Sequence, residues 1–493
     1  MLLLFFVINI EIFVNFFIEC IMTLKNINVL VLLFFLTINT IKGDCEACCE
    51  DCCNDCFKKE SKDINTKGNE NNEVEEIYEK KSEKKSNNLS QNNSSMEDNN
   101  QDDNQDDNQY NFQNNNQYNF QNNAPQNNRF ITGETLGLEN VGATCYMNAT
   151  LQCLFHIKEL SHYFFNCYYS VYNSYFFNPF YLSNKEKLFP QYMNLLCQVF
   201  YPEFNENLNK YYAPQAFKDT ISALNPLFQG IQANAAKDLL QFILETMHGE
   251  LKWAKGNFVD YNINQKDENA AKLYFYNSYM TQNKSPINDV LYAINEIKNT
   301  CSSCKITKYN FQCYNLLHFP LKEAKRFIVS NKKEDKNFDE KNYVLTLEDC
   351  FEHNEHVDYF TGDNQMYCND CEKDVDAVSQ TVLCTTPTVL SIVLNRGKAN
   401  KDFEEDFKFG IELDIKKYIH NTAFKHGKYY LIGMVVHSGG HGMDGHFIAY
   451  CRMDKNSKWF RYNDAFVDPV DNIEEKFKEN KPYILFYHYD NDV

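Results

Sequence analysis

Positive charge is scarce in this sequence. Its 493 residues include 48 Lys and Arg against 67 Asp and Glu, which gives a formal net charge of −19. An acidic chain is repelled by phosphate backbones, so this balance argues against nucleic acid as a partner and favours basic partners.

Long uninterrupted apolar runs are also missing. Residues 1–19 are apolar but broken by polar side chains, and the run VLVLLFFL at 29–36 is shorter than the roughly 20 residues of a helical membrane span. If translation began at Met22, Lys25 would precede an apolar region of signal-peptide length. We interpret residues 1–44 as a signal peptide or membrane anchor; the alternatives are a mis-assigned start or an unprocessed apolar tail.

Apolar residues are sparse in residues 57–129, where Asn, Gln, Asp, Glu, Lys and Ser dominate. Such a segment cannot bury a core, so we expect a disordered linker. It repeats QYNFQNN at 109–115 and 117–123, which is typical of a solvated spacer, with an interaction tail as the alternative.

Two other regions differ sharply from this linker. Residues 45–56 hold six cysteines in CEACCEDCCNDC, which leaves disulfides after secretion, metal binding and lipidation beside an anchor all open. Residues 130–493 are rich in Phe, Tyr, Leu and Ile and can bury a sizeable core. The ordered domain is therefore expected in residues 130–493.

A cysteine stands at the start of an apolar helical pattern in GLENVGATCYMNATLQCLF, residues 137–155. The spacing of the apolar residues predicts one buried helix face, made by Met147, Leu151, Leu154 and Phe155. Cys145 would be the first helical residue, where the helix dipole favours a thiolate. This position suits a nucleophile; the alternative is a buried structural cysteine.

A thiolate nucleophile needs a base and a group that orients the base. Three histidines compete for the role of base: His437 ends a predicted strand at 429–437, His441 lies in a Gly-rich loop, and only His446 leads directly into a second strand. A third strand at 459–462 ends at Asn463. Antiparallel pairing of these strands is expected to bring Asn463 beside His446.

At these residues the sequence resembles the ubiquitin-specific proteases, which are papain-like cysteine deubiquitinases. GLENVGATCYMNATLQCL resembles the Cys box of that family, and GHFIAYCR followed by WFRYND resembles its His box, about 300 residues later. The resemblance covers about residues 136–490. It implies an α+β papain-like fold with a helical thumb, a β-strand palm and zinc-bearing fingers.

The resemblance also implies roles for individual residues. Cys145 would be the nucleophile, His446 the general base and Asn463 the third triad member, in place of the more common Asp. The Asn140 amide would stabilise the oxyanion, and Asp464 matches a second acidic position expected to assist. Between the boxes the likeness is looser: TPTVLSIVLNRG at 386–397 lacks the usual Lys-Arg-Phe.

Two C-x-x-C pairs suit tetrahedral coordination of a structural zinc ion. They are Cys301 with Cys304 and Cys368 with Cys371, separated by 63 residues. The polar segment at 330–342 is interpreted as an insertion at a hairpin tip that accounts for this separation. The resemblance places a four-cysteine zinc finger here, and the alternative is two unoccupied turns.

The implied activity is hydrolysis of isopeptide or peptide bonds after the Gly-Gly tail of ubiquitin, through a thioester. Ubiquitin and ubiquitinated proteins would be the partners, with membrane association through the N-terminus. The alternatives are a catalytically weak ubiquitin-binding adaptor and a protease for another ubiquitin-like modifier. The cytosolic or nuclear location usual in the family conflicts with the signal-like N-terminus, and an enzyme anchored with its core facing the cytosol would resolve the conflict.

Overall fold

The computed structural model describes residues 134–172, 187–200, 211–252, 260, 263–334, 336, 338–396, 406–420, 427–438, 445–479 and 481–490. The predictions for residues 1–44, 45–56 and 57–129 lie outside these residues, as does the loop at 439–444. Within the part of the chain that is described, no helix is both long and apolar enough to cross a membrane.

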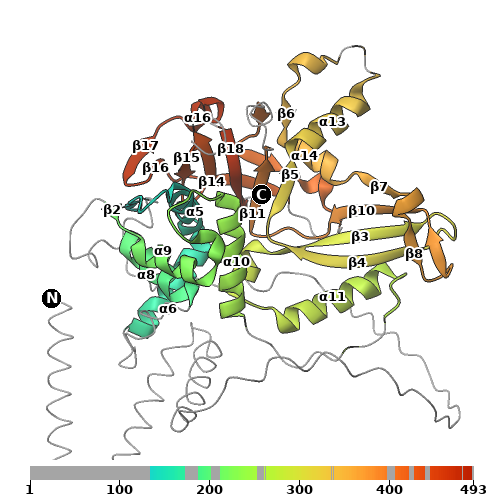
Figure 1. The fold of residues 1–493 in the computed structure, drawn as a ribbon, viewed down its shortest axis with the longest axis horizontal. Helices are drawn as coiled ribbons and strands as arrows, with labels where there is room; N and C mark the ends of the chain where they lie inside the picture. Colours follow the sequence, from blue (N-terminus) through green and yellow to red (C-terminus); the bar gives the residue numbers. More distant parts are fainter. Residues whose placement is uncertain are drawn as a thin grey trace, which may run out of the picture. The chain divides into compact units, whose positions relative to one another are not determined.

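Helices form the first part of the described chain (Figure 1). They are α5 (Cys145–Phe155), α6 (Lys158–Tyr172), α8 (Leu188–Phe200), α9 (Gln215–Leu224), the short η2 (Pro226–Phe228) and α10 (Ala236–Leu251). Two more helices follow, α11 (Glu268–Gln282) and α12 (Pro286–Leu291), each started by a side-chain cap, from Asp267 and Ser285.

An eight-stranded sheet forms the second layer. Its order is β17-β16-β15-β14-β18-β11-β5, with β13 on β14. The strands are β5 (Leu317–Pro320), β11 (Val389–Asn395), β13 (Glu412–Asp414), β14 (Lys428–Ser438), β15 (His446–Cys451), β16 (Trp459–Asn463), β17 (Phe466–Val470) and β18 (Lys481–Tyr489). All pairings are antiparallel except that of β5 with β11.

Both faces of this sheet are buried at its central strands. Along β11, Val389 and Val393 join a hydrophobic cluster shared with α5, α8 and α10, whereas Leu390 and Ile392 join a second cluster on the opposite face. The second cluster includes side chains of α13 (Leu321–Lys332), α14 (Leu347–Asn354) and α16 (Ile473–Glu479). The alternation along one strand therefore produces two cores.

Helix α5 packs against β14 and β15, at the centre of the first cluster. Every residue from Cys145 to Phe155 is buried, whereas the apolar spacing predicted burial of only one face. The polar side chains of α5 are accommodated by hydrogen bonds, for example from Gln152 Nε2 to the Leu136 carbonyl at 2.8 Å. The spacing missed this because buried polar residues with partners look solvent-exposed in a sequence.

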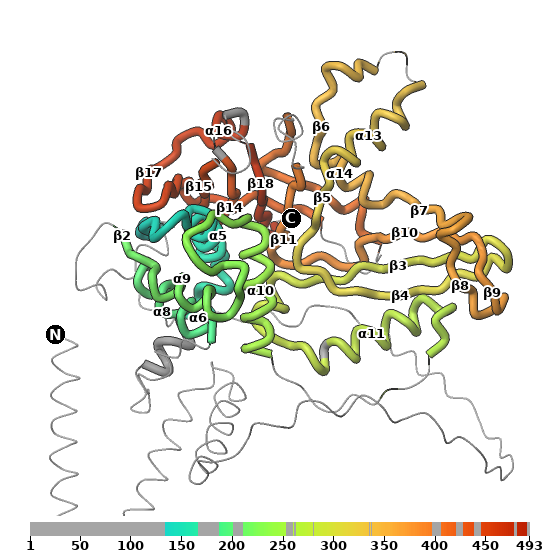
Figure 2. The backbone as a smooth tube through the Cα atoms, in the orientation of Figure 1, coloured from blue at the N-terminus to red at the C-terminus, as the bar shows by residue number. Residues whose placement is uncertain are grey.

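A second sheet, in the order β4-β3-β10-β7, extends away from α5–α10, and α11 packs along its β4 edge (Figure 2). Its strands are β3 (Ala293–Cys301), β4 (Thr307–Tyr314), β7 (Val357–Phe360) and β10 (Ala377–Leu383), and the hairpin of β8 (Met366–Cys368) and β9 (Lys373–Val375) lies at its far end. The remaining strands are β1 (Gly137–Leu138), β2 (Tyr211–Tyr212), β6 (Leu345–Thr346) and β12 (Phe407–Lys408).

The interpretation of residues 330–342 as a hairpin-tip insertion was wrong. This segment begins within α13 and leads to the short η3 (Glu340–Asn342), and α13 lies well away from β8 (Figure 1). The chain between the two C-x-x-C pairs contains β4, β5, α13, β6, α14 and β7. The separation in sequence arises because the chain crosses to the large sheet and back between the two turns.

Candidate active site

Cys145 and His446 face each other across the contact between α5 and β15. Cys145 is the first residue of α5 and is only 6% exposed, and His446 is the first residue of β15. A hydrogen bond that the Cys145 sulfur accepts from the protonated His446 ring is the main reason that the pKa of His446 is raised to about 9, against the opposing effect of burial. This arrangement favours an imidazolium beside the sulfur.

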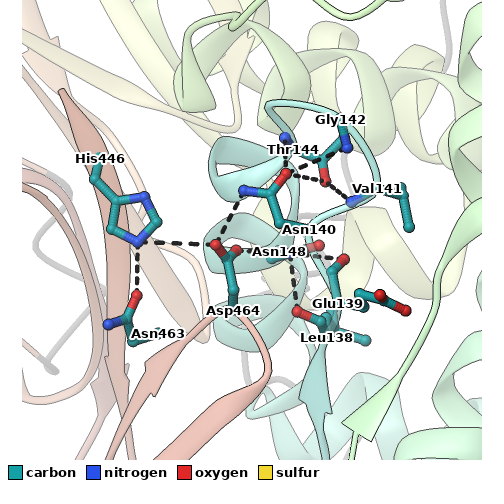
Figure 3. A network of polar contacts seen from close by, with 10 residues as sticks. All are labelled: Leu138, Glu139, Asn140, Val141, Gly142, Thr144, Asn148, His446, Asn463 and Asp464. Atoms are coloured by element: carbon teal, nitrogen blue, oxygen red, sulfur yellow. Dashed lines mark hydrogen bonds and ion pairs between the residues drawn. The ribbon is translucent and has the colours of Figure 1, made fainter. Parts of the chain in front are cut away.

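The other side of the His446 ring is held by Asn463, the last residue of β16. His446 Nε2 lies 2.6 Å from Asn463 Oδ1 (Figure 3). An amide oxygen can only accept, so Nε2 carries a proton and Nδ1 is the ring nitrogen left for the thiol. The same hydrogen bond contributes to the raised pKa of His446.

Asp464 connects His446 to the loop in front of Cys145. It lies in the tight turn between β16 and β17 with φ +50°, a left-handed conformation that Asp tolerates. Its carboxylate accepts hydrogen bonds from Asn140 Nδ2 at 3.0 Å and Asn148 Nδ2 at 2.7 Å, and lies 3.8 Å from His446 Nε2 (Figure 3). One carboxylate therefore joins three neighbouring polar side chains.

Asn140 organises the turn that leads into α5. Its Oδ1 accepts from the backbone N–H of Gly142 at 3.3 Å and of Thr144 at 2.9 Å, and also from the Thr144 hydroxyl (Figure 3). Gly142 has φ +117° and Ala143 φ +49°, so the turn needs this support. The Asn140 amide nitrogen has two hydrogens, and its bond to Asp464 leaves the second for another acceptor.

Asn148 is a site residue that the sequence analysis missed. It is 2% exposed, and its Nδ2 lies within hydrogen-bonding distance of the Leu138 and Glu139 carbonyls as well as Asp464. The available signal was a polar side chain inside an apolar helix, three residues after Cys145. This nitrogen is also where a glycan would be attached at the Asn148–Thr150 sequon, and its burial leaves no room for one.

His437, the first alternative candidate for the base, is buried on β14, the strand that pairs with β15. A Cβ atom built on Gly445 would come within 1.7 Å of the His437 ring, so only glycine fits directly before His446. Burial lowers the pKa of His437, and the neighbouring His446 lowers it further. His437 thus serves as packing for the start of β15, while the other rejected histidine, His441, lies outside the described residues.

The four cysteines of the two C-x-x-C pairs come together at the far end of the second sheet. Their Sγ atoms all lie within 4.8 Å of one another, with Cys301 and Cys371 separated by 3.9 Å and Cys304 and Cys368 also by 3.9 Å. Tetrahedral zinc with Zn–S bonds of about 2.3 Å places sulfurs about 3.8 Å apart, so the cluster fits zinc in donor type and in spacing.

The two turns have similar geometry. The residues after each pair, Lys305 and Glu372, have positive φ angles of 62° and 55°, and the Cys304 N–H donates to Cys301 Sγ at 3.4 Å. Asp370, within the second pair, forms ion pairs with Lys266 and Lys308. Four thiolates would leave no open coordination position, which suits a structural rather than a catalytic ion.

Comparison with known proteins agrees with this geometry. The family model described as "Ubiquitin carboxyl-terminal hydrolase" matches residues 136–487. The chain belongs to this family. The resemblance to ubiquitin-specific proteases is thereby confirmed.

Curated relatives are distant in sequence. Bovine ubiquitin carboxyl-terminal hydrolase 2 is 24% identical over 360 residues, covering 71% of this chain and 54% of the relative. Hydrolase 4 of Saccharomyces cerevisiae is 24% identical over 381 residues, covering 72% of this chain and 39% of the relative. The chain thus spans about half the length, or less, of these relatives.

Solved structures share the fold. In a structure of the SAGA Ubp8/Sgf11/Sus1/Sgf73 DUB module bound to ubiquitin aldehyde, the matching chain has a TM-score of 0.52 and 20% identity, with 74% of this chain and 71% of that chain covered. A module with monoubiquitin gives a TM-score of 0.53, 20% identity and coverages of 75% and 72%. At this identity the likeness establishes the fold, and the roles of the individual residues stay predictions.

Proposed function

We propose that this chain is a thiol-dependent deubiquitinase that hydrolyses isopeptide or peptide bonds at the C-terminal glycine of ubiquitin. The observation that carries this proposal is the His446 ring held between the Cys145 thiol and Asn463 Oδ1. Membership of the ubiquitin carboxyl-terminal hydrolase family supports the choice of ubiquitin.

The first half-reaction would be acylation. The Cys145 thiolate attacks the carbonyl carbon of the ubiquitin terminal glycine and forms a C–S bond. The oxyanion accepts hydrogen bonds from the second Asn140 Nδ2 hydrogen and from the backbone N–H of Cys145 at the start of α5. As the C–N bond breaks, the His446 imidazolium donates its Nδ1 proton to the leaving amine.

The second half-reaction would be hydrolysis of the thioester. Neutral His446 now takes a proton from water, and the resulting hydroxide attacks the same carbonyl carbon. The C–S bond breaks, the Cys145 thiolate returns, and ubiquitin leaves with a free carboxylate. Asn463 keeps the imidazole in one tautomer through both steps, although it adds no negative charge.

The four-cysteine cluster would hold a structural zinc ion in the fingers. Cys301, Cys304, Cys368 and Cys371 supply the thiolates, and the ion would fix the β3–β4 turn to the β8–β9 turn. The reaction at Cys145 does not involve it.

A ubiquitin probe with a C-terminal propargyl group tests the proposal. The full chain is expected to form a covalent adduct about one ubiquitin larger, and Cys145→Ala is expected to form none, with hydrolysis of a ubiquitin fluorogenic substrate falling by at least about 10⁴-fold. Cys153→Ala is the matched control, because Cys153 is a buried thiol on the same helix.

The remaining outcomes decide between the alternatives. Binding of ubiquitin with no adduct and no turnover would indicate an adaptor and contradict the proposal. Reaction with a probe built on another ubiquitin-like modifier, but not on ubiquitin, would show that the chain processes that modifier instead.

A further inference from the structure

Three large apolar side chains stand in solvent around the segment that leads to Cys145. They are Tyr211, Ile231 and Phe466, which are 38%, 79% and 71% exposed, and they are called the apolar rim below. None of them has a role in the chemistry proposed above. Large apolar side chains gathered at one place on a surface are typical of contact sites for other molecules.

Each member of the apolar rim touches the segment at 137–142 or its immediate neighbour. Tyr211 pairs with Gly137 in the β1–β2 ladder. Gly137 lies so close to the residue before Phe466 that an added Cβ would be 2.3 Å from the Ala465 carbonyl oxygen. Ile231 Cγ2 lies 3.4 Å from the Cβ position of Gly142, so it covers the turn before the nucleophile.

The surroundings of the apolar rim are firmly held. The Lys218 ammonium is buried and donates to the carbonyls of Phe228 at 2.6 Å and Gly230 at 3.0 Å, which fixes the turn that presents Ile231. On the other side, the Leu138 N–H donates to the Asp464 carbonyl at 2.9 Å, which ties β1 to the β16–β17 turn. The exposure of these side chains is therefore a feature of ordered backbone.

The proposed chemistry indicates which part of the substrate, ubiquitin or the chain attached to the leaving amine, lies near the apolar rim. The leaving amine must reach the His446 imidazolium, so the chain attached to that amine lies beside His446 and its partner Asn463. Phe466 is the direct cross-strand partner of Asn463, and directly opposed residues project to the same face of an antiparallel pair. Phe466 therefore lies on the leaving-group side of the scissile bond.

β2 and β17 lie at one end of the described domain and the β8–β9 hairpin at the other, with α5 and β15 between them (Figure 2). The exposed carboxylate of Glu139, beside Asn140, accompanies the apolar rim, whereas that of Asp468 on β17 is paired with Arg461 at 3.4 Å. This combination suits a segment that carries apolar and basic side chains around the modified lysine.

We infer, on the basis of the proposed function, that the apolar rim docks the polypeptide segment of the conjugated protein that carries the modified lysine. Tyr211, Ile231 and Phe466 then contribute to selection among target segments. Recognition of ubiquitin itself lies on the other side of the scissile bond and does not depend on them.

Two substrates that differ only in the leaving group test this inference in the full chain. One is ubiquitin joined to a small dye, and the other is ubiquitin joined through an isopeptide bond to a lysine peptide with flanking Leu and Arg residues. In the double variant Ile231→Ser and Phe466→Ser, kcat/KM for the peptide substrate should fall about tenfold, as when an interface hot spot is truncated. For the dye substrate it should stay within about twofold.

Tyr359→Ser is the matched control, because Tyr359 is 72% exposed and lies on β7, at the opposite end of the described domain from β17 (Figure 1). It should leave the ratio of the two kcat/KM values unchanged. An unchanged ratio in the double variant, whether both values fall or neither does, would overturn the inference while leaving the proposed function intact. A wild-type chain that cleaves neither substrate would overturn the proposed function and the inference with it.

Discussion

The candidate active site and the four-cysteine cluster are both assembled from distant segments, but by different forces. Cys145 and His446 lie on α5 and β15, which share the largest hydrophobic cluster of the described domain. The four cysteines have only a small cluster of their own, whose buried members are Cys301, Cys368 and Val375. Apolar burial holds the first site, whereas the second has too little of it to hold four thiols together.

This difference has a consequence for the effect of mutations. At the active site the backbone is fixed by the core, so removing one polar side chain should change the chemistry and leave the fold intact. At the cluster the geometry depends on two turns and the ion pairs of Asp370, so a bound metal ion would contribute folding free energy directly.

The largest expected effect is on catalysis at the candidate active site, and it comes from a change at Asn140. Asn140→Ala removes both the proposed oxyanion donor and the acceptor of the Gly142 and Thr144 N–H groups. The kcat for ubiquitin hydrolysis should fall about 10²–10³-fold, which is typical when one oxyanion donor is lost.

Asn456→Ala, in an exposed turn after β15, is the control for this variant. Thermal unfolding of both variants should stay close to that of the wild type. A fall of less than about tenfold in kcat for Asn140→Ala would show that this amide is not an oxyanion donor.

An intermediate effect is expected at the cluster, on stability rather than on chemistry. Cys371→Ser should remove bound zinc, measured by elemental analysis, and should raise hydrogen exchange at the tips of β3, β4, β8 and β9. The melting temperature should fall by about 2–4 °C for each kcal/mol lost. Cys313→Ser on β4 should keep its zinc, and full retention of zinc in Cys371→Ser would argue against the four-thiolate site.

The smallest expected effect concerns the pH dependence that His446 gives to the candidate active site. The pKa of His446 is raised to about 9, so its imidazolium persists at neutral pH and is lost as the pH rises through about 9. The kcat/KM for an isopeptide substrate should therefore decline on the alkaline side near that pH, because protonation of the leaving amine fails. Alkylation of Cys145 by a small electrophile requires no such proton and should not decline.

Asn463→Asp extends the same experiment. In this variant a carboxylate would stand 2.6 Å from His446 Nε2 and would stabilise the imidazolium. The alkaline limb of the pH profile should therefore move to higher pH by about 1 unit. This is the lower end of the range of pKa shifts caused by a neighbouring opposite charge, because the pair is accessible to solvent. A limb that stays in place in this variant would mean that another group, not His446, sets it.

Much of the candidate site could be predicted from the sequence because its elements are local patterns. The apolar spacing after Cys145 predicted α5, and the alternation of strands around His446 placed Asn463 beside the imidazole, where the structure has it at 2.6 Å. The catalytic roles of these residues stay predictions, and so do the N-terminal segments outside the described residues.

Other features could not be predicted because they depend on contacts between distant residues. The hydrogen bond from Asn148 Nδ2 to the Asp464 carboxylate joins residues 316 positions apart. The long separation of the two cysteine pairs was misread for a similar reason, since the intervening chain leaves the second sheet after β4, adds β5 to the large sheet and returns at β7.

The sequence by itself determined which chemical groups are available: a thiol at a helix start, an imidazole at a strand start and four thiols in two tight turns. Local spacing is enough for this, because helix and strand periods are properties of the backbone. Only the tertiary structure decided that one carboxylate, Asp464, joins Asn140, Asn148 and the region of His446, and that Phe466 stands exposed beside them. Those relations arise when the core brings β1, α5 and the β16–β17 turn together.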